Sequence, residues 1–191
     1  MMNFTKTLIL ASKSPRRQAL LKEAGFQFTV KTQDTDETYP SGLEAKDVAS
    51  YIATQKALAL KDHIQHEILL AADTVVRIDQ KILGKPQDKN HAREMLSALS
   101  GKPHHVTTGV CLLTKDQKIV FDETTEVHFR SLSNQEIDYY IDEYKPFDKA
   151  GAYGIQEWIG MVAVEKIVGS YFNVMGLPVH AVYRNLVKMG I

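Results

Sequence analysis

The sequence predicts a mixed α/β fold, in which helices flank a sheet with both parallel and antiparallel strands. Short apolar segments typical of strands alternate with amphipathic helical segments along the chain. A long hairpin over residues 105–129 breaks the purely parallel order that this alternation alone predicts. The 191 residues suit one domain or two closely joined lobes. Because repeats and evident linkers are absent from the sequence, we expect a single domain over residues 1–191.

Capping signals define the elements expected in the first half of the chain. Ser14 can cap a helix in which Pro15 is the first residue, and Ser41 with Glu44 matches a capping box. The continuous apolar run before and after Asp73 predicts a strand buried on both faces. The expected elements are a strand at 7–11, a helix at 15–24, a helix opened by the capping box at Ser41 and continuing to about Lys61, and a strand at 67–78.

The second half of the chain also contains capping signals that define its helices. Asp88 is a candidate N-cap, and Ser133 with Glu136 forms a second capping box. The inward faces expected for these two helices are Ala92, Met95, Leu96 and Leu99, and Ile137, Tyr140, Ile141 and Tyr144. The other expected elements are a turn at 84–86, a hairpin of 105–114 with 118–129, a strand near 161–167 and a final helix opened by Pro178.

Charge and composition exclude some classes of protein. The chain has 23 basic and 23 acidic residues, whereas a protein that coats DNA or RNA normally has a basic surplus. We therefore expect no nucleic-acid polymer as partner. A span of roughly 20 apolar residues, as a bilayer requires, is absent, and Met1–Lys6 lack the plan of a signal peptide. The single cysteine, Cys111, excludes an internal disulfide framework. Together these features predict a cytoplasmic protein that does not contact a membrane.

The segment Ser12–Arg17 is the first candidate site. A loop between a strand and a helix start presents free backbone N–H groups and the positive end of the helix dipole, which favour an anion. Arg16 and Arg17 in the first helical turn oppose that dipole, and an anionic ligand would reverse the sign of this cost. The alternative is that both arginines are solvated beside an ordinary cap.

Asp73 is the second candidate, because it interrupts an apolar strand. An unpaired buried carboxylate destabilises a fold by roughly several kcal/mol, so a cation, a metal or several hydrogen-bond donors must lie near Asp73. A salt bridge to a neighbouring lysine or arginine, or an exposed strand end, are the structural alternatives. We favour a functional role, since carboxylates at strand ends in α/β sheets often face ligands.

Charged residues of three other segments complete the candidate set. Lys56 occupies a position where the helical period calls for an apolar side chain, and Lys85 stands in the Gly-Pro turn. A lysine in such a place ordinarily extends to water along its aliphatic stem. Glu37 is an oxygen ligand suited to a hard cation, although by itself it reads as an exposed loop charge.

Six blocks, spread in order over nearly the whole chain, resemble the Maf family. They are residues 10–17 (LASKSPRR), 72–76 (ADTVV), 84–86 (GKP), 105–109 (HVTTG), 150–156 (AGAYGIQ) and 169–178 (GSYFNVMGLP). The stretch ending in Gln156 is similar to the branch that acts on dTTP and UTP. The sequence departs from the family at Glu157 and Trp158, where glycine and small residues are expected in many relatives.

The resemblance implies a fold, an activity and a set of site residues. It implies an elongated mixed sheet with two lobes around a cleft, a homodimer, and pyrophosphohydrolase activity on nucleoside triphosphates that depends on Mg²⁺ or a similar cation such as Mn²⁺. Asp73 matches the catalytic acid/base position. The positions linked to base selection are Arg16, Thr74 and Gln156, and the polar positions lining the cleft are Ser12, Arg17, Glu37, Lys56 and Lys85.

These residues lead to one mechanistic hypothesis and two rivals. We expect Arg17, Lys56 and Lys85 to hold phosphate oxygens, Glu37 and Asp73 to bind Mg²⁺, and Asp73 to orient or deprotonate water. One rival is an inosine-triphosphate-type purine pyrophosphatase of similar architecture. The other is a non-catalytic regulator of septum formation.

Overall fold

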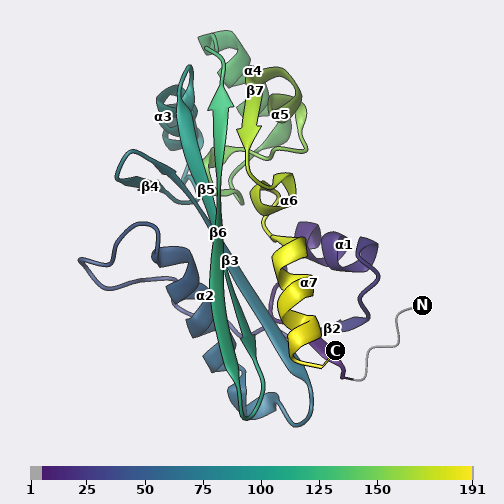
Figure 1. Ribbon diagram of the computed structural model, residues 1–191. Helices are drawn as coiled ribbons and strands as arrows, with labels where there is room; N and C mark the ends of the chain where they lie inside the picture. The colour runs from purple at the N-terminus through teal and green to yellow at the C-terminus, as the bar shows by residue number, and fades with distance from the viewer. Residues whose placement is uncertain (1–5, 191) are drawn as a thin grey trace. The chain divides into compact units, whose positions relative to one another are not determined.

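The computed structural model describes residues 6–190, which divide into two compact units (Figure 1). The first unit consists of the residues up to Asp73, Thr108–Glu123 and the residues from Gly176. The second unit consists of Thr74–Thr107 and Thr124–Met175. Residues 1–5, which belong to the segment inspected for a signal peptide, lie outside the described part. Among residues 6–190, every helix is too short or too polar to span a bilayer.

The strands form a mixed sheet, which confirms the predicted fold class. Their order is β2-β1-β3-β5-β6-β7, and β4 pairs with β3. β1 pairs in parallel with β2 and β3, whereas β4 on β3 and β7 on β6 are antiparallel. The bounds are β1 Leu8–Leu10, β2 Phe28–Val30, β3 Ile68–Ile78, β4 Lys81–Leu83, β5 Pro103–Leu113, β6 Lys118–Phe129 and β7 Val164–Val168. The expected hairpin is the β5–β6 pair.

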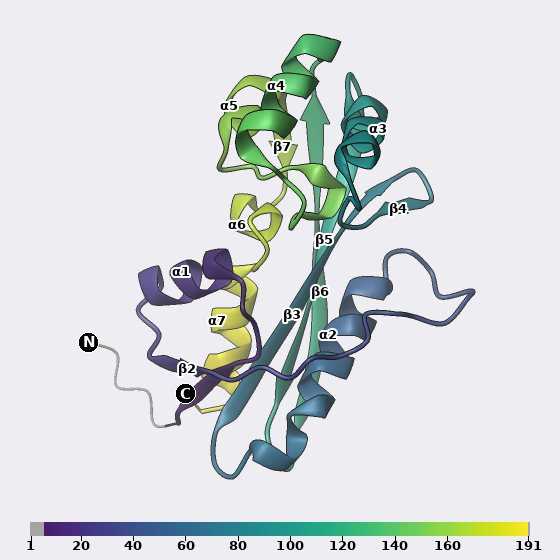
Figure 2. The same ribbon diagram turned by 180° about the vertical axis from the view of Figure 1, so that it is seen from behind.

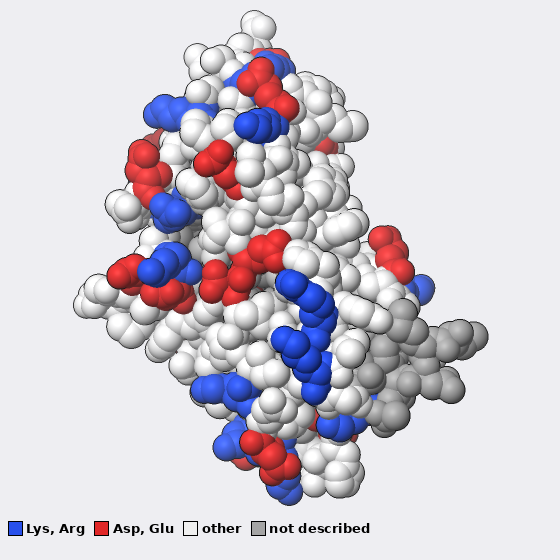
Figure 3. Space-filling model, viewed as in Figure 1, with Lys and Arg blue, Asp and Glu red and all other residues white. Residues whose placement is uncertain are grey.

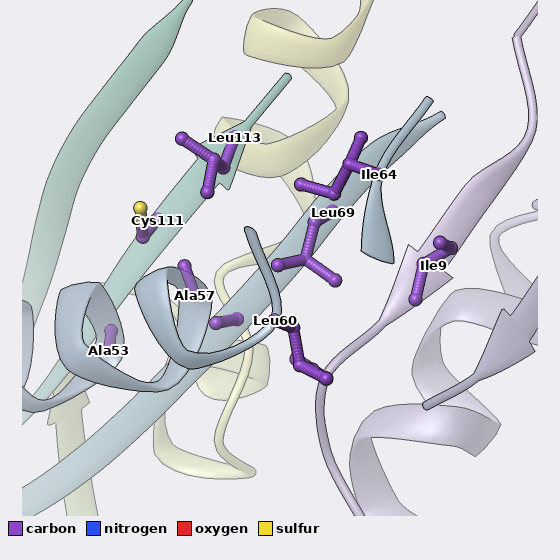
Figure 4. Packing of buried hydrophobic residues seen from close by; sticks show 10 residues of the cluster. Ile9, Ala53, Ala57, Leu60, Ile64, Leu69, Cys111 and Leu113 are labelled. Carbon is purple, nitrogen blue, oxygen red and sulfur yellow. The ribbon is translucent and has the colours of Figure 1, made fainter. Parts of the chain in front are cut away.

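The first unit has helices on both faces of its strands. α2 (Val48–Ala59), followed by the 3-10 turn η1 (Lys61–His63), covers one face, and α1 (Pro15–Glu23) and α7 (Val179–Lys188) lie side by side on the other (Figures 1 and 2). The core beneath α2 consists of small and branched side chains from α2, β1, β3 and β5 (Figure 4). Ala53 and Ala57 of α2 allow the helix to approach the strands closely, and their neighbour Cys111 of β5 is fully buried.

The start predicted for the second helix is wrong. Residues 41–47 form turns, and α2 begins only at Val48. Gly42, between the two residues of the apparent capping box, has a φ of 99°, which is incompatible with a helical first turn. The Leu43 N–H bonds to the Pro40 carbonyl instead, which makes a separate turn.

The second unit confirms both of its predicted caps. In α3 (Lys89–Leu99) the Asp88 side chain accepts from the His91 N–H, and in α4 (Asn134–Tyr144) Ser133 and Glu136 form the full capping box. The expected inward residues of both helices are buried except Tyr144, which is 36% exposed. Tyr144 stands in the last turn, next to the left-handed Lys145 that ends α4.

One predicted strand begins too early. Residues 158–163 form the short helix α5 (Trp158–Ala163), so strand β7 starts at Val164 rather than near 161. Glu157 is the N-cap of α5, and its carbonyl accepts from the N–H groups of Gly160 and Met161. Two further short helical segments, η2 (Ala150–Ala152) and α6 (Tyr171–Val174), complete the unit.

Candidate active site

The loop between β1 and α1 is organised around Ser12. Its buried hydroxyl oxygen accepts from the Ser14 N–H at 3.2 Å and from the Arg17 Nη1 at 3.3 Å. The Arg17 Nε donates to the Gly176 carbonyl at 2.7 Å, which joins α1 to the segment before α7. Ser14 is the N-cap residue, but its side chain makes no capping hydrogen bond. The loop therefore fixes the Arg17 guanidinium at the amino end of a nine-residue helix.

Arg17 is in the electrostatic field of the predicted acidic residues. Burial lowers the pKa of its guanidinium, and attraction from Asp73 and Glu37 opposes that effect. The charge of Arg16 lowers the Arg17 pKa further, so the two arginines lie close enough to repel each other. A bound anion would relieve both the burial cost and this repulsion.

Lys56 binds both predicted carboxylates. Its Nζ lies 2.6 Å from Asp73 Oδ1 and 2.8 Å from Glu37 Oε1. The Lys56 and Asp73 side chains are only 17% and 14% exposed, whereas Glu37 is 46% exposed. Three of the predicted residues, from three separate segments of the chain, thus meet in the first unit, and Arg17 from a fourth segment feels the charge of both carboxylates. The structure also contains the salt bridge named above as the structural alternative for Asp73.

A tight contact between α2 and β5 sets the place of Lys56. A Cβ added to Gly109 of β5 would lie 2.2 Å from the Ser50 nitrogen and 2.3 Å from the Ala49 carbonyl carbon. Only glycine leaves room for the α2 backbone there, which gives a physical reason for Gly109 in the HVTTG block. The contact fixes the height of the helix over the sheet, and Lys56 lies in the same helix.

The donor set in the first unit fits a hard divalent cation. Glu37 and Asp73 are brought within reach of one ammonium group, so their oxygens are close to each other. In residues 6–190 there is no cluster of three or more His, Cys, Asp or Glu side chains able to hold a metal. Mg²⁺ typically uses one or two carboxylates and completes its shell with water and substrate phosphates.

The other three predicted residues belong to the second unit, where Gly151 links their segments. Its N–H donates to the carbonyl of Gly84, the residue before the exposed Lys85. A Cβ on Gly151 would meet the Val76 side chain at 2.9 Å, and Val76 is on the same face of β3 as Thr74 by strand alternation. Gln156 follows in the same segment as Gly151 and is exposed.

Sequence reasoning missed a buried charged residue next to these segments. Lys149 is almost fully buried, and its Nζ contacts the carboxylates of Asp148 at 2.6 Å and Glu157 at 3.1 Å. It also missed that His104 is a buried partner of Tyr153, with its Nε2 at 2.8 Å from the Tyr153 hydroxyl. The AGAYGIQ block and the departure at Glu157 were sequence signals for this region, but neither indicates the buried ion pair of Lys149.

The charges on the face shown in Figure 3 are of both signs. Acidic and basic side chains lie near one another at several places on this face, large parts of it are uncharged, and a short row of basic groups is also present. This mixture agrees with the zero net charge of the chain. The absence of a nucleic-acid polymer among the partners stays a prediction.

Comparison with known proteins identifies the family. The family model described as Maf-like protein matches residues 7–189. The dTTP/UTP pyrophosphatase of Phocaeicola vulgatus is 52% identical over 95% of both chains, and that of Bacteroides fragilis is 50% identical over the same shares. The match to the solved Staphylococcus aureus Ham1 protein is 13% identical and covers 65% of this chain and 72% of that chain, at a TM-score of 0.46. The chain belongs to the Maf-like protein family.

Proposed function

We propose that this protein is a nucleoside triphosphate pyrophosphatase that converts dTTP and UTP to the monophosphate and pyrophosphate. Relatives that are about 50% identical over nearly the full chain are named dTTP/UTP pyrophosphatases, which supports these substrates. The observation that carries the chemistry is the shielded Asp73, held with Glu37 on the Lys56 ammonium and within the field of Arg17. A protein that only binds a partner has no evident use for so costly a cluster.

Positively charged side chains and the dipole of helix α1 would hold the triphosphate. Arg17 stands at the amino end of α1, where the backbone N–H groups and the helix dipole also attract an anion. Lys56 is a compact ammonium already bound to oxygen anions, and phosphate oxygens offer it the same kind of partner. We assign Ser12, Arg17, Lys56 and Lys85 to phosphate binding.

Glu37 and Asp73 are the residues that would hold Mg²⁺, or a similar cation such as Mn²⁺. When bound, such a cation neutralises charge that develops on the leaving pyrophosphate. The two carboxylates are already gathered on one cation, Lys56, so little side-chain rearrangement is needed for them to share another.

Asp73 acts on the attacking water. Its carboxylate orients the water or takes its proton while the water oxygen bonds to the α-phosphorus and the bond from that phosphorus to the bridging oxygen breaks. The pyrophosphate leaves with the bonding electron pair, and the proton passes from Asp73 to solvent. No covalent nucleophile is needed, because positioning and electrostatics supply most of the catalysis in such reactions.

Arg16, Thr74 and Gln156 are assigned to base selection. Arg16 carries hydrogen-bond donors, Thr74 carries a hydroxyl group and Gln156 carries both donors and an acceptor, and these are groups able to hydrogen bond to the edge of a pyrimidine. We include in the proposal a homodimer, which the family resemblance implies, and a cytoplasmic location, which the composition of the sequence predicts. Both can be checked by light scattering and by cell fractionation.

A pyrophosphate-release assay tests the proposal. With Mg²⁺ present, dTTP and UTP should be the best substrates in a panel of pyrimidine, purine and modified nucleoside triphosphates, and chelation of the cation should abolish turnover. Asp73→Asn should fold and lose at least about 100-fold in kcat. The exposed Asp62→Asn, from the same unit, is the matched control and should keep full activity.

Each rival predicts a different result in that assay. A preference for inosine or xanthosine triphosphate over dTTP and UTP would favour the purine pyrophosphatase. The absence of pyrophosphate release from every nucleotide would favour a non-catalytic regulator. Near-normal kcat in Asp73→Asn would remove Asp73 from the mechanism.

A further inference from the structure

Glu157 links three parts of the second unit through its carboxylate. The residue directly follows Gln156 and is the N-cap of α5. The buried Tyr140 hydroxyl of α4 donates to one of its oxygens, and Lys149 lies 3.1 Å from the other. The Lys149 side chain is only 10% exposed, so its ammonium has exchanged water for the carboxylates of Glu157 and Asp148. A buried ion pair of this kind contributes little net stability, because the desolvation of both charges offsets their attraction. A role other than stability is therefore expected for it.

The same groups fix the turn that carries Gln156. The Tyr140 hydroxyl accepts from the Gly154 N–H at 3.0 Å, and the Glu157 N–H donates to the Gly154 carbonyl at 3.0 Å. A Cβ on Gly154 would meet the Glu157 carboxyl carbon at 2.9 Å and the Lys149 Cε at 3.1 Å. The carboxylate therefore packs on the Gly154 Cα, and the turn is held from both ends.

The residues around Gln156 are buried while Gln156 itself is exposed. Tyr153 is 6% exposed and hydrogen bonds to His104, and Ile155 is 7% exposed. The segment thus has one residue available to a ligand, on a backbone that is tied to α4 by Tyr140.

We propose that Glu157, through Lys149 and Tyr140, is a positioning residue that fixes Gln156 in the conformation that reads the base. This inference rests on the proposed function. A recognition side chain on a loose turn must be ordered when the ligand binds, and prior ordering removes that cost. Because polar base recognition rejects substrates that leave its groups unpaired, a displaced Gln156 loses discrimination as well as affinity.

The test compares kinetic constants for dTTP and dGTP in Glu157→Gln and Glu157→Ala. Glu157→Gln keeps the shape and can still accept from Tyr140, but it lacks the charge paired with Lys149. Glu157→Ala lacks both interactions. In Glu157→Ala the KM for dTTP should rise roughly tenfold, and the ratio of kcat/KM for dTTP to kcat/KM for dGTP should fall roughly tenfold. Both changes should be smaller in Glu157→Gln. In both variants kcat for dTTP should stay within about threefold of the wild-type value.

Glu143→Gln, an exposed glutamate of α4, is the matched control and should leave all constants unchanged. A merely structural role for Glu157 predicts a lower melting temperature and an unchanged ratio of kcat/KM for dTTP to kcat/KM for dGTP. That result in the folded Glu157→Gln and Glu157→Ala proteins would overturn the inference. If the wild-type protein itself hydrolyses neither dTTP nor UTP, the proposed function fails. If the wild type is active and only the ratio in the variants stays constant, the positioning role alone fails.

Discussion

Replacing Lys56 by methionine tests the charge cluster on which the account depends. Methionine retains most of the aliphatic stem, so the packing of α2 is largely preserved while the ammonium is lost. Asp73, 14% exposed, would then lack the cation that lies 2.6 Å from its Oδ1. A mostly buried carboxylate without its partner is strongly destabilising.

The size of the effect follows from the exposure of each pair. Removing one partner of a buried pair costs 3–5 kcal/mol, and the low end, about 3 kcal/mol, applies because both side chains keep some contact with water. The pair with Glu37 contributes about 1 kcal/mol or less, because Glu37 is 46% exposed and water screens the interaction. We therefore expect Lys56→Met to lower the free energy of unfolding by roughly 3 to 4 kcal/mol.

Urea denaturation of a double-mutant cycle is the assay. In an Asp73→Asn background the buried charge is already absent, so Lys56→Met should cost only about 1 kcal/mol, which leaves a coupling energy of roughly 2 to 3 kcal/mol. The exposed Lys61→Met serves as control and should change stability by less than about 0.5 kcal/mol. A cost of Lys56→Met that is the same with and without Asp73 would refute the reasoning.

Three further predictions concern single residues. Burial lowers the pKa of His104 to about 4 from 6.5, so between these values the unfolded chain binds a proton that the folded chain does not. The free energy of unfolding should therefore fall by roughly 3 kcal/mol from pH 6.5 to 4 relative to His104→Gln, and parallel pH profiles of the two proteins would contradict this. Gly109→Ala should cost about 3 kcal/mol in urea denaturation, since the new methyl group meets the α2 backbone, whereas Gly84→Ala, which meets open space, should cost little; equal costs would refute the close contact. Lys85→Arg should lower kcat/KM for dTTP roughly tenfold if a compact ammonium is needed, and unchanged kinetics would indicate a surface lysine.

Local signals made much of the fold predictable. The caps at Asp88 and Ser133 depend on hydrogen bonds between residues three apart, which a sequence displays directly. The false start at Ser41 fails for an equally local reason, the left-handed Gly42, which the capping pattern does not reveal. Helix α5 was not predicted because a short apolar run suits a strand or a helix equally well, and the Glu157 side chain makes no capping hydrogen bond that could distinguish the two.

The candidate site was predictable in part. Asp73 in an apolar run required a cation, a metal or several donors nearby, and Lys56 was conspicuous on an apolar stripe, but only the fold shows that the two side chains are partners. The network of Tyr140, Lys149 and Glu157 was beyond prediction, because Tyr140 fits an apolar helix face and nothing local shows where its hydroxyl is directed. The roles assigned to the site residues, the bound cation and the extent of the domain stay predictions.

Identification of the products in ¹⁸O-labelled water tests the central claim most directly. The account predicts that dTTP yields dTMP and pyrophosphate in equal amounts, with the label in the phosphate of dTMP, because water attacks the α-phosphorus. Phosphorus NMR detects both the products and the isotope shift. Formation of dTDP with inorganic phosphate, or the appearance of the label in pyrophosphate, would contradict the account.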